Sequence, residues 1–204
     1  RNIPMRKMLP EPADKESLNL PNDKHILILQ GSGINIHRGS EELVDAMRYL
    51  EDCMLLIIGG GDVLPILKQK VTENHWEDRV RFFPRMPYKD MMAITRLAEL
   101  GFTLDKPNNL NYLFSLPNKL FDYIQANVPI VASHLTEIER IIRDYNIGTF
   151  IEEHNPEHIA KKIKETLSDE ETLKTWKNNL NFAAQELCWE NEEQTLIKIY
   201  EQYI

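Results

Sequence analysis

Short apolar runs alternate with longer amphipathic stretches along most of the chain. The first run, at residues 25–30, centres on four consecutive apolar residues, which is typical of a parallel strand covered on both faces. Five further strands are expected, at residues 54–58, 80–83, 100–104, 129–133 and 148–151.

Between these runs, apolar residues recur at helical spacing, as Leu43, Met47 and Leu50 do within residues 41–50. Further helices are expected after Asp62, at residues 88–97, from Pro117, at residues 135–144 and 156–167, and as a pair over residues 170–204 that is broken near Cys188. Because strand and helix alternate about six times, the sequence predicts an α/β fold. We expect a Rossmann-like, doubly wound parallel sheet of six strands with helices on both faces.

Two segments lie outside this alternation. Residues 1–24 contain four prolines and no sustained period, so they are expected to form an irregular arm or an interdomain linker. Residues 106–116 are rich in asparagine and proline and are expected to be a loop. The predicted division is a linker at 1–24, a Rossmann-like domain at 25–187 and a C-terminal helix at 188–204.

The composition argues against several classes of partner and cofactor. With 24 Lys and Arg against 32 Asp and Glu, the net charge of −8 argues against nucleic acid or an anionic membrane as the main partner. Cys53 and Cys188 have no metal-ligand spacing, so we expect thiols in a reducing, cytoplasmic compartment and no metal. No apolar run approaches the ~20 residues that span a bilayer, and no signal peptide is visible. The first residue is Arg1, which fits either processing or a piece of a longer protein.

In an open parallel sheet, ligands bind beyond the carboxyl ends of the strands, so the loops there hold the candidate site. The first loop contains Gly31, Ser32 and Gly33, whose backbone can approach a ligand closely. It also contains Arg38, which can bind a diphosphate through two N–H groups. A plain turn is the alternative for this loop. His37 could donate to a sugar or phosphate oxygen, or it could simply be exposed.

Two further loops contribute candidates. After the second strand, three glycines that include Gly60 precede Asp62, which fits either a tight turn with a helix N-cap or a close approach to a ligand. After the third strand, Arg85 and Met86 lie between two prolines. The prolines keep the backbone extended, which suits edge-on hydrogen bonds to a base.

The helix that begins at Pro117 carries the most informative residues. Its free N–H groups and its macrodipole favour a phosphate, and Lys119 adds a positive charge there. Asp122 follows three residues later and suits the hydroxyl groups of a ribose. A solvated Lys–Asp pair is the alternative. Asn118 or Ser115 could cap the helix.

Residues 117–132, PNKLFDYIQANVPIVA, closely resemble a segment of retaining glycosyltransferases with the GT-B fold. The best match is family four, also called group 1, in which Pro-Asn-Lys-Leu-Phe-Glu-Tyr is a common form. Residues 31–47, residues 55–61, the region from Val80 and the strand from Gly148 also look like parts of this family. The family's glycine falls at Asn127, which tolerates a left-handed conformation. An earlier acid of many members falls at Phe114, so the resemblance does not extend to that sugar contact.

The resemblance implies the C-terminal, donor-binding half of a two-domain enzyme, with a helix from Trp189 that crosses back to an N-terminal domain not found in this sequence. The expected donor is a nucleotide-sugar, UDP-linked, and the expected acceptor is a glycan or a lipid-linked molecule. The full-length enzyme could associate peripherally with a membrane. No cofactor is expected, because fixed positive charge would stabilise the departing diphosphate. We expect the fragment alone to bind nucleotide weakly and without turnover.

By position in the family's motifs, Arg38 and Lys119 would bind the diphosphate and Asp122 would hold the ribose. The backbone near Arg85 and Met86 would contact the base. The remaining donor-binding candidates are Gly31, Ser32, Gly33, His37, Gly60, Pro117, Asn118 and Leu120.

Three other functions compete with this interpretation. A nicotinamide-dependent oxidoreductase is disfavoured because Ile36 stands where the third fingerprint glycine would be, and because glycines rather than an acid stand at the end of the second strand. A sugar-nucleotide epimerase of similar architecture would need acidic catalytic residues that are not evident. A non-catalytic α/β binding module would share only the fold.

Overall fold

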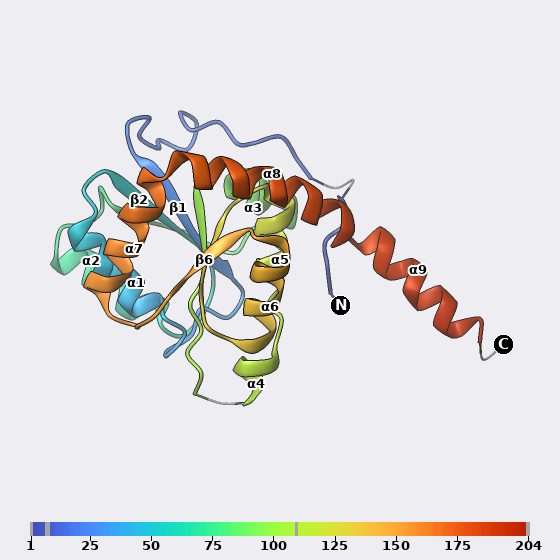
Figure 1. Cartoon of the computed structure of the whole chain (residues 1–204). Helices are drawn as coiled ribbons and strands as arrows, with labels where there is room; N and C mark the ends of the chain where they lie inside the picture. Colours follow the sequence, from blue (N-terminus) through green and yellow to red (C-terminus); the bar gives the residue numbers. More distant parts are fainter. Residues whose placement is uncertain (1, 7–8, 109, 203–204) are drawn as a thin grey trace.

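A computed structural model describes residues 2–6, 9–108 and 110–202. Within these residues, six strands form one parallel sheet in the order β3-β2-β1-β4-β5-β6 (Figure 1). The strands are β1 (His25–Gly31), β2 (Cys53–Gly59), β3 (Val80–Phe83), β4 (Leu100–Thr103), β5 (Ile130–Ser133) and β6 (Gly148–Ile151). Each lies within one residue of its expected bounds, so the predicted sheet is confirmed.

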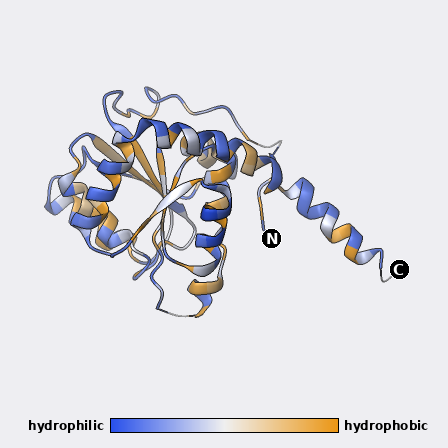
Figure 2. Cartoon of the chain, viewed as in Figure 1, coloured by the Kyte–Doolittle hydropathy of each residue, from blue (hydrophilic) through white to orange (hydrophobic). Residues whose placement is uncertain are grey.

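Helices cover both faces of this sheet (Figure 1). One face packs against α1 (Ser40–Ala46), α2 (Leu64–Glu73) and α7 (Pro156–Ser168). The other packs against α3 (Tyr88–Thr95), α5 (Asn118–Ala126), α6 (Thr136–Tyr145) and α8 (Glu170–Glu186). Strand β1 shows the alternation, because Ile28 belongs to one core and Leu29 to the other. Figure 2 shows the resulting layers, with apolar strands between helices that present polar outer faces.

Two local predictions were wrong. The expected loop at residues 106–116 contains a short helix, α4 (Leu110–Phe114), which at five residues is too short to show a helical period. The helix expected at residues 41–50 ends at Ala46 and continues as a 3₁₀ helix, η2 (Met47–Tyr49). The broken helix pair after residue 170 is present as α8 and α9 (Trp189–Tyr200).

The N-terminal arm packs onto the domain, and its described residues form turns, bends and irregular chain. Ile3 and Leu20 are buried in the core between the sheet and α5. The backbone N–H of Ala13 donates to the carbonyl of Ala93, with N and O 2.9 Å apart. The division of the chain at residues 24 and 187 stays a prediction.

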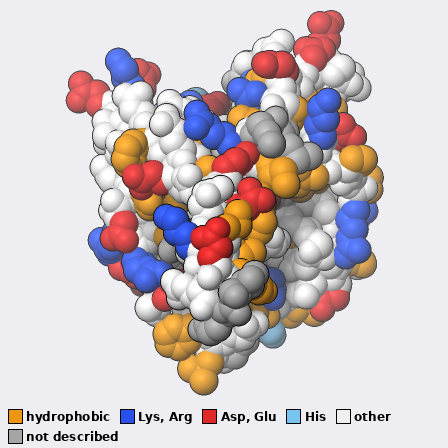
Figure 3. All heavy atoms as spheres, turned by 90° about the vertical axis from the view of Figure 1, so that its right-hand side faces the viewer, with side chains coloured by type: hydrophobic (Ala, Val, Ile, Leu, Met, Phe, Trp, Pro, Cys, Tyr) orange, Lys and Arg blue, Asp and Glu red, His pale blue; other side chains and the backbone are white. Residues whose placement is uncertain are grey.

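Helix α9 projects from the body of the molecule and buries none of its residues (Figure 1). Its apolar side chains Leu196, Ile197, Ile199 and Tyr200 are 42–61% exposed. Figure 3 shows the face of the molecule on this side, where acidic, basic and apolar side chains are interspersed. Among the described residues, no helix has the length and apolarity needed to cross a bilayer.

Helix α5 is fixed to the middle of the sheet by Tyr123. The Tyr123 hydroxyl accepts a hydrogen bond from the backbone N–H of Gln30 at 3.3 Å and lies 3.2 Å from the carbonyl oxygen of Phe102. The ring packs on Gly101 of β4, where an added Cβ would lie 2.8 Å from three ring carbons. The lack of a side chain at Gly101 therefore sets how closely α5 approaches the sheet.

We predict that Gly101→Ala destabilises the fold by about 1–3 kcal/mol, because the added methyl group must displace the buried ring of Tyr123. Urea unfolding measures the change. Gly33→Ala is the matched control, since the nearest atom to its added Cβ is 3.7 Å away. Its effect should stay within about 0.5 kcal/mol. Equal effects of the two substitutions would contradict the proposed packing.

Candidate functional site

A pocket of about 440 Å³ opens at the carboxyl ends of β1 and β2. The strand order reverses direction between β1 and β4, and parallel sheets bind ligands at such a point. The pocket walls come from the ends of β1 and β2, the segment after β3, helix α3, the first turns of α5, and the N-terminal arm. The lining residues are Asn2, Ile3, Pro4, Gln30, Gly31, Ser32, Ile58, Gly59, Arg85, Met86, Tyr88, Met91, Asn118, Lys119 and Asp122.

Helix α5 presents an uncapped N-terminus to this pocket. Pro117 is the N-cap residue, with an extended backbone at φ −71° and ψ 142°, and no side chain caps the helix. The prediction that Asn118 or Ser115 caps it was therefore wrong. The side-chain oxygen of Asn118 instead accepts a hydrogen bond from the amide of Asn2 at 3.1 Å. The helix ends at Asn127 in the left-handed conformation, φ 60° and ψ 40°, as expected.

Asp122 is 6% exposed and lies in a network of neutral hydrogen-bond donors. One carboxylate oxygen accepts from the Tyr88 hydroxyl at 2.9 Å, and the other accepts from the Gln30 amide at 3.0 Å. The Thr95 hydroxyl in turn donates to the side-chain amide oxygen of Gln30 at 2.6 Å. Burial raises the pKa of Asp122 to about 6, although the hydrogen bonds from Tyr88 and Gln30 act in the opposite direction. The alternative of a solvated Lys119–Asp122 pair was therefore wrong.

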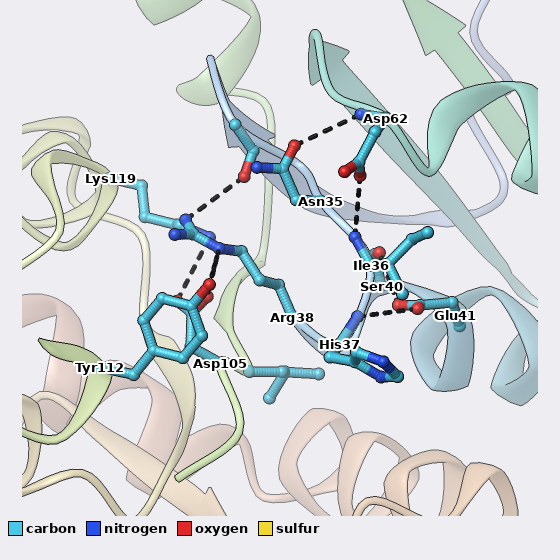
Figure 4. Close-up of polar contacts among 12 residues, drawn as sticks. Asn35, Ile36, His37, Arg38, Ser40, Glu41, Asp62, Asp105, Tyr112 and Lys119 are labelled. Carbon is cyan, nitrogen blue, oxygen red and sulfur yellow. Dashed lines mark hydrogen bonds and ion pairs between the residues drawn. The ribbon is translucent and has the colours of Figure 1, made fainter. Parts of the chain in front are cut away.

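Arg38 and Lys119 meet at a third residue, Asp105 (Figure 4). The Nε of Arg38 lies 3.5 Å from one oxygen of the Asp105 carboxylate, and the Nζ of Lys119 lies 3.9 Å from the other. Sequence reasoning missed Asp105, which comes two residues after β4. The rule that ligands bind beyond strand ends points to this loop as well, and applying it there would have found this acid.

Arg38 is held in place by Tyr112 and Gly33 as well as by Asp105. Its Nε donates to the Tyr112 hydroxyl at 3.2 Å, and the guanidinium carbon lies 4.7 Å from the centre of the Tyr112 ring. Its Nη1 donates to the carbonyl of Gly33 at 3.3 Å. Tyr112 belongs to α4, the helix that the sequence pattern did not predict. Nearby, burial lowers the pKa of Lys119, while the carboxylate of Asp105 acts to raise it.

The glycines after β2 are explained by contact between two loops. A Cβ on Gly59, whose φ is +134°, would collide with the carbonyl oxygen of Gly31, and one on Gly61 would collide with the carbonyl oxygen of Ile34. Asp62 accepts a hydrogen bond from the backbone N–H of Ile36 at 2.9 Å (Figure 4). The suggestion that this acid caps the next helix was wrong, because α2 has no side-chain cap. The loops after β1 and β2 therefore form one packed unit.

The structure brings many of the sequence candidates together at the pocket and places others elsewhere. Seven line it: Gly31, Ser32, Arg85, Met86, Asn118, Lys119 and Asp122. Arg38 and Gly33 belong to the loop after β1, where Arg38 donates to the Gly33 carbonyl and shares Asp105 with Lys119. Gly60 lies under Arg85, whose Nε would be 2.5 Å from an added Cβ.

Three candidates do not face the pocket. Pro117 borders it as the N-cap of α5, and Leu120 is fully buried in the core. His37 is exposed, and its ring points away from Arg38 (Figure 4). Tyr88, Gln30, Tyr112 and Asp105 are the site residues that the sequence did not single out.

Metal-ligating side chains do not gather in the described part of the chain, where no group of three or more His, Cys, Asp or Glu could hold an ion. Cys53 and Cys188 are free and buried, and burial raises the pKa of the Cys53 thiol to about 12.

Solved structures share this fold at low sequence identity. Sucrose-phosphate synthase from Thermosynechococcus elongatus aligns with a TM-score of 0.77 and 22% identity, over 98% of this chain and 50% of that chain. The C-terminal domain of LpcC, a glycosyl transferase group 1 family protein from Francisella tularensis, aligns with a TM-score of 0.65 and 16% identity. The alignment covers 89% of this chain and 96% of that domain. The chain thus has the fold of a C-terminal domain of a GT-B glycosyltransferase.

The family itself is shown by the sequence. The profile of the glycosyl transferases group 1 family matches residues 11–181, so the chain belongs to this family. Two uncharacterized glycosyltransferases of Methanocaldococcus jannaschii are 20% and 21% identical to it, over 93% and 82% of this chain. The matches cover 51% and 43% of those proteins, so the chain spans about half the length of these relatives.

We predict that Asp122 makes the stability of the fold depend on pH between about 4 and 6. Its pKa is 3.8 ordinarily and about 6 when folded, so the folded state holds a proton that the unfolded state releases. Wild-type stability relative to Asp122→Asn is therefore highest below pH ~4, and it falls by roughly 3 kcal/mol as the pH rises through 6. Urea unfolding of both proteins at each pH measures this difference.

Tyr88→Phe is the companion variant, because it removes a hydrogen bond that favours the ionised carboxylate. The loss of stability should then extend to higher pH than in the wild type. A wild-type minus Asp122→Asn difference that stays constant from about pH 4 to 7 would contradict the assignment.

Proposed function

We propose that this chain is the donor-binding half of a retaining hexosyltransferase, which transfers a sugar from a UDP-linked donor to a glycan or lipid-linked acceptor. One observation carries the proposal: Arg38 and Lys119 meet at a single carboxylate beside a pocket whose wall also holds Asp122. This arrangement offers positive charge to a diphosphate and a hydrogen-bond acceptor to a ribose within one site.

The size and layout of the pocket support a nucleotide-sugar. Its volume of about 440 Å³ lies in the usual range for small-molecule sites, roughly 300–1,000 Å³. We place the diphosphate at Lys119 and the uncapped start of α5, the ribose at Asp122, and the base beside Arg85 and Met86. Met86 and Ile58 give that end of the pocket apolar surface for the face of a base.

Structures of similar fold support UDP as the nucleotide. HepE from Anabaena was solved in complex with UDP-glucose, and it aligns with a TM-score of 0.77 and 14% identity over 98% of this chain and 56% of its own. The pneumococcal O-GlcNAc transferase GtfA was solved with UDP and GlcNAc, and it aligns with a TM-score of 0.69 and 15% identity. The chain covers 38% of GtfA, so the likeness concerns the fold of one domain.

The chemistry follows from where charge develops in the reaction. When the bond between the sugar and the diphosphate breaks, negative charge grows on the departing diphosphate. Cations that are already in place stabilise this charge without reorganising, and the low exposure of Lys119 strengthens their effect. At neutral pH most Asp122 is ionised, and its carboxylate keeps acceptor capacity beyond the bonds from Tyr88 and Gln30. No protein nucleophile is required.

We propose further that the acceptor is bound by residues outside this sequence. The chain alone would then bind the donor without transferring the sugar at an appreciable rate. In the same proposal the complete enzyme is cytoplasmic and approaches a lipid-linked acceptor from the membrane surface.

We predict that the chain binds UDP-glucose in calorimetry and that Arg38→Ala and Lys119→Met each weaken binding by at least about tenfold. Loss of one charge-assisted contact to a phosphate costs roughly 1.5–3 kcal/mol, which corresponds to that change. Lys70→Met is the matched control, because the Lys70 ammonium pairs with Asp45 outside this pocket, at 2.8 Å. The affinity of Lys70→Met for UDP-glucose should equal that of the wild type.

NADH serves as the competing ligand for the oxidoreductase alternative. Binding of NADH without binding of UDP-glucose would overturn the proposal. Unchanged UDP-glucose affinity in both Arg38→Ala and Lys119→Met would show that the diphosphate lies elsewhere.

A further inference from the structure

We propose that Asp105 is a positioning residue for the donor site: it holds the Arg38 guanidinium and the Lys119 ammonium toward one point and keeps Lys119 charged before the donor arrives. This inference rests on the proposed function, because it assigns the two cations to the donor's diphosphate. Asp105 itself would not touch the reacting atoms.

The backbone beside Asp105 is held in place through Leu104, which contacts two other segments of the chain. His154 lies with its Nε2 3.0 Å from the carbonyl oxygen of Leu104 and 3.0 Å from the hydroxyl of Ser133. Gly39, with φ +73°, packs so closely that an added Cβ would collide with the Leu104 carbonyl oxygen. The loop that carries Arg38 therefore rests directly on the residue before Asp105.

The carboxylate of Asp105 is buried, and two cations lie within ion-pair distance of it. Asp105 is 5% exposed, and its oxygen nearest Arg38 makes no hydrogen bond within the described residues. Its distances of 3.5 Å to Arg38 Nε and 3.9 Å to Lys119 Nζ are those of ion pairs. A buried carboxylate is costly unless opposite charge or hydrogen bonds offset the loss of water. Two cations supply that offset here.

Lys119 is likewise a buried charged group, and its charge is opposite to that of Asp105. Its side chain is 11% exposed, and within the described residues its ammonium donates no hydrogen bond to the protein. An ammonium group has three donors, so they stay available to an anionic ligand in the pocket that Lys119 lines. Asp105 lies near enough to hold the charge but too far to occupy those donors.

The charged groups around Lys119 shift its pKa in opposite directions. Burial and the nearby Arg38 guanidinium lower the pKa of Lys119, and the Asp105 carboxylate raises it. Asp122, Tyr88 and Arg85 line the same pocket, and Tyr112 faces Arg38 from α4. Neutralising Asp105 would leave the lysine beside a like charge with no acid in contact, so the lysine would lose its proton at lower pH.

Two roles for Asp105 predict opposite results. If it only adds a negative charge near the diphosphate, its neutralisation should tighten donor binding at every pH. If it positions and charges Lys119, neutralisation should make donor binding sensitive to alkaline pH. The pH profile of affinity therefore separates them.

The experiment is a calorimetric titration with UDP-glucose from about pH 6.5 to 8.5, a ligand whose phosphates are both esterified and keep a constant charge over this range. We expect the affinity of Asp105→Asn to begin falling at lower pH than that of the wild type, approaching about tenfold per pH unit once Lys119 titrates. A profile parallel to the wild type, or tighter binding at every pH, would overturn the inference.

Three variants make this result specific. Asp45→Asn neutralises the carboxylate of another Asp–Lys pair, at 2.8 Å from Lys70, and should leave the profile unchanged. Asp105→Glu should restore the wild-type profile, because it returns the negative charge. In the Lys119→Met background, adding Asp105→Asn should not change the pH dependence of UDP-glucose affinity, because the titrating lysine is absent. Circular dichroism checks that each variant folds, and Asp105→Ser replaces the Asn variant if that one does not.

A readout without donor keeps the two proposals distinguishable. In protein labelled with ¹³C-lysine, NMR follows the Lys119 side chain through its titration. A lower Lys119 pKa in Asp105→Asn supports the positioning role, and an unchanged one overturns it. If the wild type binds no UDP-glucose, the proposed function fails, while the NMR titration still decides whether Asp105 keeps Lys119 charged.

Discussion

The close approach of α5 to the sheet is the constraint on which the site depends. The buried ring of Tyr123 lies directly on Gly101, and its hydroxyl is within hydrogen-bond distance of the backbones of β1 and β4. These strands flank the point where the sheet order reverses, so the first turn of α5 opens into the pocket there. Lys119 and Asp122 lie on the same helix, three residues apart, so helix geometry sets the spacing between cation and acid.

Two buried acids near this helix have different surroundings and therefore different chemistry. Asp122 is surrounded by neutral donors, and burial moves its pKa to about 6. Asp105 contacts two cations and makes no hydrogen bond through one of its oxygens. The chain carries a net charge of −8, yet positive charge gathers at one partly enclosed place. Local arrangement, rather than net charge, decides what a site of this kind can bind.

The glycine-rich loops show how one sequence feature can serve packing and function together. Gly59 and Gly61 allow the loop after β2 to lie against the loop after β1. Asp62 then joins these loops by accepting from Ile36, and this pairing helps to set the path of the segment that carries Arg38. A run of glycines beside a strand end therefore reflects contact between neighbouring loops here, and its effect on a ligand is indirect.

The sequence alone determined the six strands, most helices, the left-handed end at Asn127 and the family. These features are recorded locally, in apolar periodicity and in a short motif, so neighbouring residues suffice to predict them. Several of the residues that line the pocket were also identifiable, because strand ends and a helix N-terminus mark the place. Only the tertiary structure decided that Asp105 lies between Arg38 and Lys119, that Tyr112 holds Arg38 from a one-turn helix, and that Tyr88 donates to Asp122. Most of these contacts join side chains tens of residues apart, and their existence depends on how loops pack, which no local pattern encodes.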